Sequence, residues 1–243
     1  MKHYIIYIVS ILACMVSCTA EDISTDTGHG TLCLGATRAG AYSDKIIDED
    51  LAIKVFDNNG NLYVQYPAGG VPNKIILEPG VFTIQAYTDN QETWALANNG
   101  LGEACYYGET QVDIEFDQIA YVNMQVPLTN YAVTLTLPDM FQLLFKSHSL
   151  SLTADERAVE IQESQKAYFK INEGGFTYKL SATNIDNISH ATSPITYKKV
   201  EAGKLYNITY YYGTDANSGG LDIEITDDME TEDDYLPLSE EDN

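Results

Sequence analysis

Apolar and polar residues alternate along much of this chain with a period of two, which is the period of a β-strand. The clearest case is residues 81–87, in which the even-numbered positions are Phe, Ile and Ala. This segment directly follows Pro79-Gly80. Proline presets the backbone for a turn, and glycine accepts a positive φ without a side-chain clash. Residues 75–87 therefore predict a strand, a tight turn and a second strand.

A cruder copy of this pattern occupies residues 200–210, where Ala202-Gly203 precedes another alternating segment. Two copies of one strand-turn-strand unit predict two related β-sandwich domains in tandem. Alternation or apolar runs predict the remaining strands at residues 31–37, 51–56, 62–66, 112–117, 120–126, 131–137, 149–153, 167–171, 176–182, 195–200, 205–212 and 221–226.

One turn has a specific chemistry. Asn59-Gly60 lies between two expected strands, and this dipeptide is the strongest short-range signal of a β-hairpin. The surrounding residues 57–61 resemble a calcium loop, but the glycine comes two positions early and no glutamate stands at the far end. We therefore interpret this segment as a hairpin turn.

The expected fold is all-β, with a domain boundary at residues 127–130. The N-terminal β-sandwich covers residues 31–129, and the C-terminal β-sandwich covers residues 130–226. After Pro138, the residues Phe141, Leu144 and Phe145 recur on one helix face, which predicts a single short helix in the second domain. Residues 227–243 are so acidic that we expect a disordered tail.

The charge of the chain excludes one class of partner. The 243 residues include 13 basic and 36 acidic side chains, which gives a formal net charge of −23. Nucleic-acid binding depends on basic residues that neutralise phosphates, so it is excluded. The same acidity would repel an anionic membrane surface, so any membrane attachment needs a different device.

The N-terminus provides such a device. Lys2 and His3 precede an apolar run at residues 4–13 that is too short to span a bilayer and fits a signal peptide. A small residue before a cysteine, as at Cys14 and Cys18, resembles the lipobox of bacterial lipoproteins. We favour lipidation of Cys18 and a signal peptide over residues 1–17, with residues 18–30 as a tether. An ordinary cleaved secretory signal is the alternative.

Glu21 and Asp22, close behind Cys18, resemble the surface-export signal of Bacteroidetes lipoproteins. Further motifs follow in order: Gly-Thr-Leu-x-Leu at 30–34, Leu-x-Pro-Gly-x-Phe-Thr-Ile at 77–84, Tyr-Tyr-Gly-Glu-Thr at 106–110, and Val-x-Leu-x-Leu at 133–137 before the helix. Together they resemble the fimbrillin-related lipoprotein domain family of Bacteroidetes over residues 28–227. This resemblance implies two transthyretin-like β-sandwiches, attachment to the outer membrane, and a role as fimbrial subunit, anchor or adhesin.

The resemblance also implies a processing site. Fimbrillin-type subunits assemble by strand exchange after cleavage at a basic residue near the first strand, and Arg38 directly follows the expected first strand. Strand addition of this kind uses main-chain hydrogen bonds at a vacated edge. The plainer interpretation is that Arg38 is a solvated loop residue.

Three aromatic residues are candidates for ligand binding. Trp94, the only tryptophan, lies in the longest loop of the first domain, near Tyr106 and Tyr107 in the sequence. An exposed aromatic side chain on such a loop could stack on a sugar or a partner. The alternative is that Trp94 folds back with Leu96 and Leu101 to cover the end of its own sandwich.

The two cysteines of the mature chain, Cys33 and Cys105, form either a disulfide or a pair of buried thiols, and their spacing does not decide between these. The four histidines show no zinc-binding or triad spacing, and no nucleophile or phosphate-loop motif is present. We expect no enzyme activity, no metal and no cofactor. The predicted function is a lipid-anchored surface protein in pilus assembly, anchoring or adhesion. The alternative is a glycan-binding lipoprotein that serves an outer-membrane nutrient importer.

Overall fold

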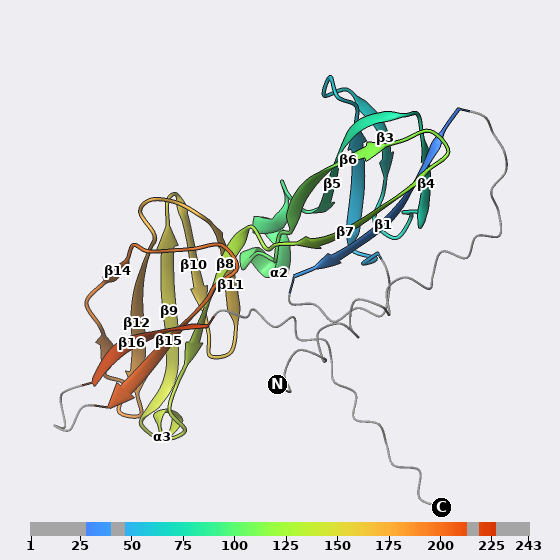
Figure 1. Cartoon of the computed structure of the whole chain (residues 1–243). Coiled ribbons are helices and arrows are strands. Elements are labelled where there is room, and N and C mark those ends of the chain that lie inside the picture. The colour runs from blue at the N-terminus through green and yellow to red at the C-terminus, as the bar shows by residue number, and fades with distance from the viewer. Residues whose placement is uncertain (1–27, 40–46, 213–218, 227–243) are drawn as a thin grey trace, which may run out of the picture.

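The computed structural model describes residues 28–39, 47–212 and 219–226, and these form an all-β fold with a few helical turns (Figure 1). This confirms the predicted fold class. The chain is described below as an N-terminal half, up to Leu128, and a C-terminal half, from Thr129. That each half folds as an independent domain stays a prediction.

Two sheets make up the N-terminal half, in the strand orders β4-β1-β7 and β3-β2-β5-β6. Its elements are β1 (Gly30–Arg38), β2 (Leu51–Phe56), β3 (Leu62–Tyr66), β4 (Lys74–Leu77), β5 (Gly80–Thr88), the 3-10 helix η2 (Trp94–Leu96), α2 (Ala97–Gly100), β6 (Tyr107–Ile114) and β7 (Ile119–Val126). Strands β2 and β3 pair antiparallel, which confirms the hairpin predicted from Asn59-Gly60.

Two further sheets make up the C-terminal half, in the orders β10-β9-β12-β13, with β14 also pairing to β12, and β11-β8-β15-β16. Its elements are β8 (Asn130–Thr136), α3 (Phe141–Leu144), β9 (Phe145–Ala154), β10 (Arg157–Ile161), β11 (Lys166–Lys170), β12 (Phe176–Asn184), β13 (Ser189–Ala191), β14 (Ile195–Tyr197), β15 (Leu205–Tyr212) and β16 (Gly219–Thr226).

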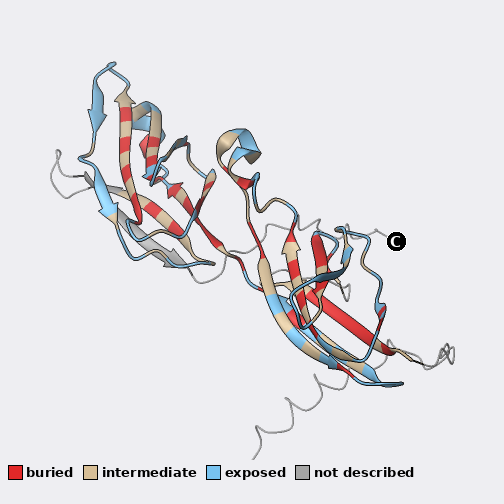
Figure 2. Ribbon diagram, turned by 90° about the horizontal axis from the view of Figure 1, so that it is seen from above, coloured by how far each residue is buried: buried red, intermediate tan, exposed pale blue. Residues whose placement is uncertain are grey.

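The buried residues form two separate clusters, one in each half, and Figure 2 shows buried positions in both halves. In β5 the predicted inward residues Phe82, Ile84 and Ala86 are 0–4% exposed, while their neighbours are partly or fully exposed. The second cluster is centred on Tyr131, whose ring stacks on Phe169 with centroids 5.6 Å apart. Burial of one face of each sheet is the main force that stabilises such a sandwich.

The two halves share one topology, but the predicted repeat unit was wrong. Strand β1 is antiparallel to β4 and parallel to β7, and β8 is likewise antiparallel to β11 and parallel to β15. The counterpart of β4 and β5 is therefore β11 and β12, which flank Gly174-Gly175, and not residues 200–210. The shared sequence Phe-Thr in β5 and β12, at 82–83 and 176–177, follows the turn in both halves.

The turn at Pro79-Gly80 does not close a hairpin. Strand β4 pairs with β1 and β5 pairs with β2 and β6, so the turn carries the chain from one sheet to the other. Gly80 has the predicted positive φ, at 148°. A β-carbon built there would meet no atom within 4 Å, so only the backbone conformation demands glycine at this position.

Two smaller expectations need correction. The predicted helix is a single turn, α3, and Phe145 already starts β9, although Phe141 is buried as expected. Strands β10 and β13 were missed, because β10 alternates only weakly and all three residues of β13 are exposed. In the described part of the chain, no helix is long and apolar enough to cross a membrane.

Candidate functional site

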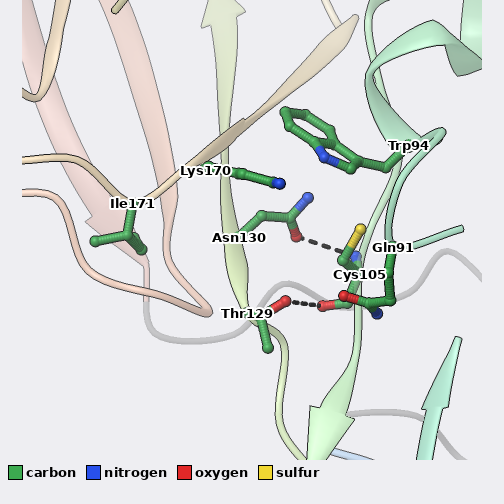
Figure 3. Close-up of a pocket in the computed structure, with 7 residues that line it drawn as sticks. All are labelled: Gln91, Trp94, Cys105, Thr129, Asn130, Lys170 and Ile171. Carbon is green, nitrogen blue, oxygen red and sulfur yellow. Dashed lines mark hydrogen bonds between the residues drawn. The ribbon is translucent and has the colours of Figure 1, made fainter.

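A cavity of about 250 Å³ lies where the two halves meet (Figure 3). Its walls come from the β5–β6 loop, the segment between β7 and β8, and the end of β11. The lining residues are Gln91, Trp94, Cys105, Thr129, Asn130, Lys170 and Ile171. Three of these, Trp94, Cys105 and Asn130, are 1–6% exposed, so much of the wall is fixed by packing.

The loop positions Trp94 through its own backbone. The Trp94 amide donates to the carbonyl oxygen of Asn90 at 2.8 Å, and the Asn90 side chain donates to the carbonyl oxygen of Ala104 at 2.8 Å, which draws the two ends of the loop together. The short helical turn η2 then directs the indole towards the C-terminal half.

Arg157, at the start of β10, holds the two halves together. Its guanidinium carbon lies 5.1 Å from the centroid of the Trp94 ring and 4.8 Å from that of Phe169. Its Nη2 donates to the carbonyl oxygen of Gly100 at 2.6 Å, and its Nη1 donates to the carbonyl oxygen of Tyr168. Partial burial lowers the pKa of this guanidinium, but an arginine remains charged at any physiological pH.

Backbone contacts reinforce this arrangement. The Tyr168 amide donates to the carbonyl oxygen of Leu101 at 2.8 Å, so β11 is tied directly to the loop of the other half. Gly102 has φ of 86°, and a β-carbon there would lie 3.1 Å from the Trp94 ring and 3.2 Å from the Arg157 guanidinium. Glycine at this position therefore permits the ring and the guanidinium to approach the loop.

Asn130 links the halves from the opposite wall. Its Oδ1 accepts from the Cys105 amide at 3.1 Å, and its Nδ2 donates to the carbonyl oxygen of Glu103 at 2.8 Å. Thr129 donates from Oγ1 to the carbonyl oxygen of Cys105 at 2.9 Å. Because the buried Asn130 amide uses both its donor and its acceptor in these hydrogen bonds, it fixes the position of β8 relative to the β5–β6 loop. We call the set Trp94, Gly102, Asn130 and Arg157 the joint.

The chemistry of the cavity is that of a structural contact. Burial raises the pKa of the Cys105 thiol to about 11, so this residue is protonated and unreactive near neutral pH. Of the described residues that line the cavity, Lys170 alone is a cation, and its Nζ lies 6.0 Å from the Trp94 ring centroid. Within the described residues, no group of three or more His, Cys, Asp and Glu side chains could hold a metal ion.

The structure separates the three aromatic candidates. Trp94 is buried, as one of the two sequence interpretations expected, but it covers the C-terminal half and not the end of its own sandwich; Leu96, expected to help, is 80% exposed. Tyr106 is buried against Arg38, and Tyr107 is half-buried and donates to Glu109 at 2.8 Å. Buried rings at Trp94 and Tyr106 cannot stack on a sugar without leaving these contacts.

Cys33 and Cys105 are both buried, and no disulfide joins them. The reason is topological, because Cys33 lies within β1 whereas Cys105 lies at the joint. Of the two sequence alternatives, the structure has the buried thiols. The lipidation candidates Cys18 and Cys14 and the export residues Glu21 and Asp22 lie outside the described residues.

Arg38 is the last residue of β1 and is not a solvated loop residue. Its guanidinium contacts the carboxylates of Asp48 at 2.7 Å and Asp50 at 3.0 Å, and its side chain is 21% exposed. Desolvation opposes the charge, but the hydrogen bond and the two carboxylates outweigh it and raise the pKa of Arg38. The processing role assigned to this residue stays a prediction.

Apart from Trp94 itself, no sequence pattern indicated the joint. Arg157 is one of only two arginines, and Asn130 is the polar residue directly before the strand predicted at residues 131–137. Both facts are visible in the sequence, but neither reveals which residue contacts Trp94.

Three comparisons relate the chain to known proteins. A family model described as "Domain of unknown function (DUF4493)" matches residues 28–237. A search of curated proteins found no match. Among solved structures, a fimbrial assembly protein from Parabacteroides distasonis is 11% identical with a TM-score of 0.50, and the match covers 82% of this chain and 98% of that one. The tip fimbrial protein Mfa3 from Porphyromonas gingivalis is also 11% identical, with a TM-score of 0.46 and coverage of 81% and 99%.

Proposed function

The chain belongs to the DUF4493 family, and from this premise we propose that it is a lipid-anchored, non-enzymatic protein of the bacterial cell surface that serves pilus assembly, pilus anchoring or adhesion. Membership of this family and the fold shared with a fimbrial assembly protein support the resemblance to fimbrillin-related proteins that the sequence motifs indicated. The finer assignments of outer-membrane anchoring and pilus assembly remain proposals.

The joint is the observation that carries this proposal. Two β-sandwich halves are fixed to each other by a buried ring, a guanidinium and several hydrogen bonds, so the chain forms an extended unit with a set geometry (Figure 1). Such a unit suits a structural element that must transmit force or hold a partner at a distance from the membrane. An enzyme would instead need a cleft with activated groups.

Strand exchange is the assembly route that we propose for this unit. Strand β1 lies in the middle of its sheet, between β4 and β7, so its removal would open a groove with hydrogen-bonding partners on both sides. Cleavage after Arg38 would release it. A cut there would also sever the lipid anchor from the rest of the subunit, so processing and stable anchoring exclude each other in one copy.

The experiment that tests the surface assignment uses the N-terminal residues. Cys18→Ala should abolish lipid labelling and release the protein from membranes, whereas Cys14→Ala should do neither. Replacing Glu21 and Asp22 with alanine should leave labelling intact but protect the protein from protease added to whole cells. Labelling that survives in Cys18→Ala would contradict Cys18 as the acylated residue, and unchanged protease access would contradict the export signal.

The second candidate function is a glycan-binding lipoprotein that serves a nutrient importer. Because Trp94 is buried, its loop no longer supports glycan binding. A polar groove on another face of the N-terminal half supports this function instead.

A further inference from the structure

A groove of about 500 Å³ lies on the outer face of the β3-β2-β5-β6 sheet, away from the joint. Its lining residues are Phe56, Asp57, Asn58, Gly60, Val81, Thr83, Gln85 and Gln111. The strand register explains how they meet, since Thr83 in the central strand β5 lies opposite Phe56 on one side and Gln111 on the other. Its volume falls within the range of about 300–1,000 Å³ typical of ligand sites.

The β2–β3 turn forms a rigid wall of this groove. Asp57 accepts from the Asn59 amide at 2.9 Å and the Asn61 amide at 2.8 Å through Oδ1, and from the Asn61 side chain at 3.0 Å through Oδ2. These hydrogen bonds lower the pKa of Asp57, the Asn61 side chain contributing most. The wall is therefore shaped before any ligand arrives, which reduces the entropy cost of binding.

The groove also presents polar side chains that are available to a ligand. In the described part of the chain, the side chains of Asn58, Thr83 and Gln111 make no hydrogen bond to another residue, and Asn58 and Gln111 are exposed. Each amide offers two donors and an acceptor, and the hydroxyl offers one of each kind. Beside them, the half-buried Phe56 ring and Val81, which is 43% exposed, provide an apolar strip.

This combination fits one ligand chemistry. A sugar ring presents an apolar C–H face, which packs on an aromatic side chain, and a rim of hydroxyls, which pair with amides. Among the described residues that line the groove, Asp57 alone is charged, and the whole chain carries a net charge of −23, so an anionic ligand is disfavoured. We propose that this groove binds a neutral oligosaccharide.

The proposal rests on the second candidate function and moves its site from the Trp94 loop to the sheet face. It is tested with the purified full chain in detergent on an array of neutral glycans and of sialylated or uronate-containing glycans. We expect binding to at least one neutral glycan. Gln111→Ala and Thr83→Val should each weaken that binding by about three- to tenfold, because each removes one hydrogen-bonding group.

Two controls make the result specific. Gln125→Ala changes an exposed glutamine on β7, in the other sheet, and should bind as the unaltered protein does. Trp94→Phe tests the joint cavity and should also leave binding unchanged. Binding of acidic glycans alone, no glycan binding at all, or wild-type affinity in Gln111→Ala would each overturn the proposal. Because the array measures glycan binding by the purified protein alone, these outcomes do not bear on the fimbrial proposal.

Discussion

Replacing Arg157 with methionine should uncouple the two halves of the molecule. Methionine keeps most of the length and apolar bulk of the side chain but removes its charge and donors. The change deletes the charged hydrogen bonds to the carbonyl oxygens of Gly100 and Tyr168, together with the contact between the cation and the Trp94 ring.

The magnitude follows from these contacts. A hydrogen bond from a charged group contributes about 1.5–3 kcal/mol, and a cation over an indole about 0.5–2 kcal/mol. Relief of the cost of partly burying the guanidinium offsets some of this loss. We therefore expect the free energy that couples the halves to fall by roughly 2–4 kcal/mol.

Trp94 makes the assay selective, because the only tryptophan of the chain lies in the joint. Denaturant unfolding is followed by tryptophan fluorescence, which reports the joint, and by far-UV circular dichroism, which reports all strands. In Arg157→Met the fluorescence transition should move to lower denaturant and precede the loss of strand signal. Lys170→Met removes the other cation near the ring without breaking a backbone contact, and should shift neither curve by more than about 0.5 kcal/mol.

Coincident and unshifted transitions in Arg157→Met would refute the reasoning. They would mean that packing alone holds the halves together, and that the Arg157 guanidinium contributes no stability to the joint.

Three further predictions test other parts of the structure. Gly80→Val should lower the free energy of unfolding by about 1–3 kcal/mol through backbone strain alone. Gly174→Val, at the equivalent turn but without a positive φ, should lower it clearly less, and equal decreases in the two variants would contradict the positive φ assigned to Gly80. Asp48→Asn should speed tryptic cleavage after Arg38 several-fold, because it breaks the ion pair between these two side chains. Unchanged cleavage would count against release of β1, as would cleaved protein that forms no assemblies with intact subunits. Burial raises the pKa of Cys105 to about 11, above that of an unfolded thiol, so the unfolded state loses its proton first and stability should fall by about 2 kcal/mol between pH 9 and 11. Tyrosines whose pKa is raised by burial add a fall of the same sign, so in Cys105→Ala the decrease in unfolding free energy over this range should be smaller by about 2 kcal/mol. A decrease identical to that of the unaltered protein would disprove the assignment.

The sequence predicted the parts of the fold that local patterns encode. Alternation in β5 and in β8 identified the inward faces correctly, because burial on one side of a sheet imposes a period of two. The Asn59-Gly60 hairpin was equally accessible, because turn chemistry is local. The length of α3 was overestimated: Phe145 follows the helical spacing of apolar residues, but it belongs to β9 and pairs with β12.

Contacts between residues far apart in the sequence could not be predicted from such local patterns. Nothing near Trp94 in the sequence indicates that its partner is Arg157, more than sixty residues away, so the same ring was compatible with a ligand platform and with a buried contact. The repeat was misplaced because Ala202-Gly203 resembles the first turn more than Gly174-Gly175 does. The Phe-Thr pairs of β5 and β12 were the signal that could have corrected it.

Crosslinking on intact cells tests the proposed surface role most directly. A short crosslinker is applied to bacteria that carry an epitope-tagged full chain, and the adducts are identified by mass spectrometry. We predict adducts with other β-sandwich fimbrial subunits, formed outside the cell and lost in Cys18→Ala. Adducts with an outer-membrane importer in place of fimbrial subunits, or a protein that the external reagent cannot reach, would contradict a role in pilus assembly or anchoring.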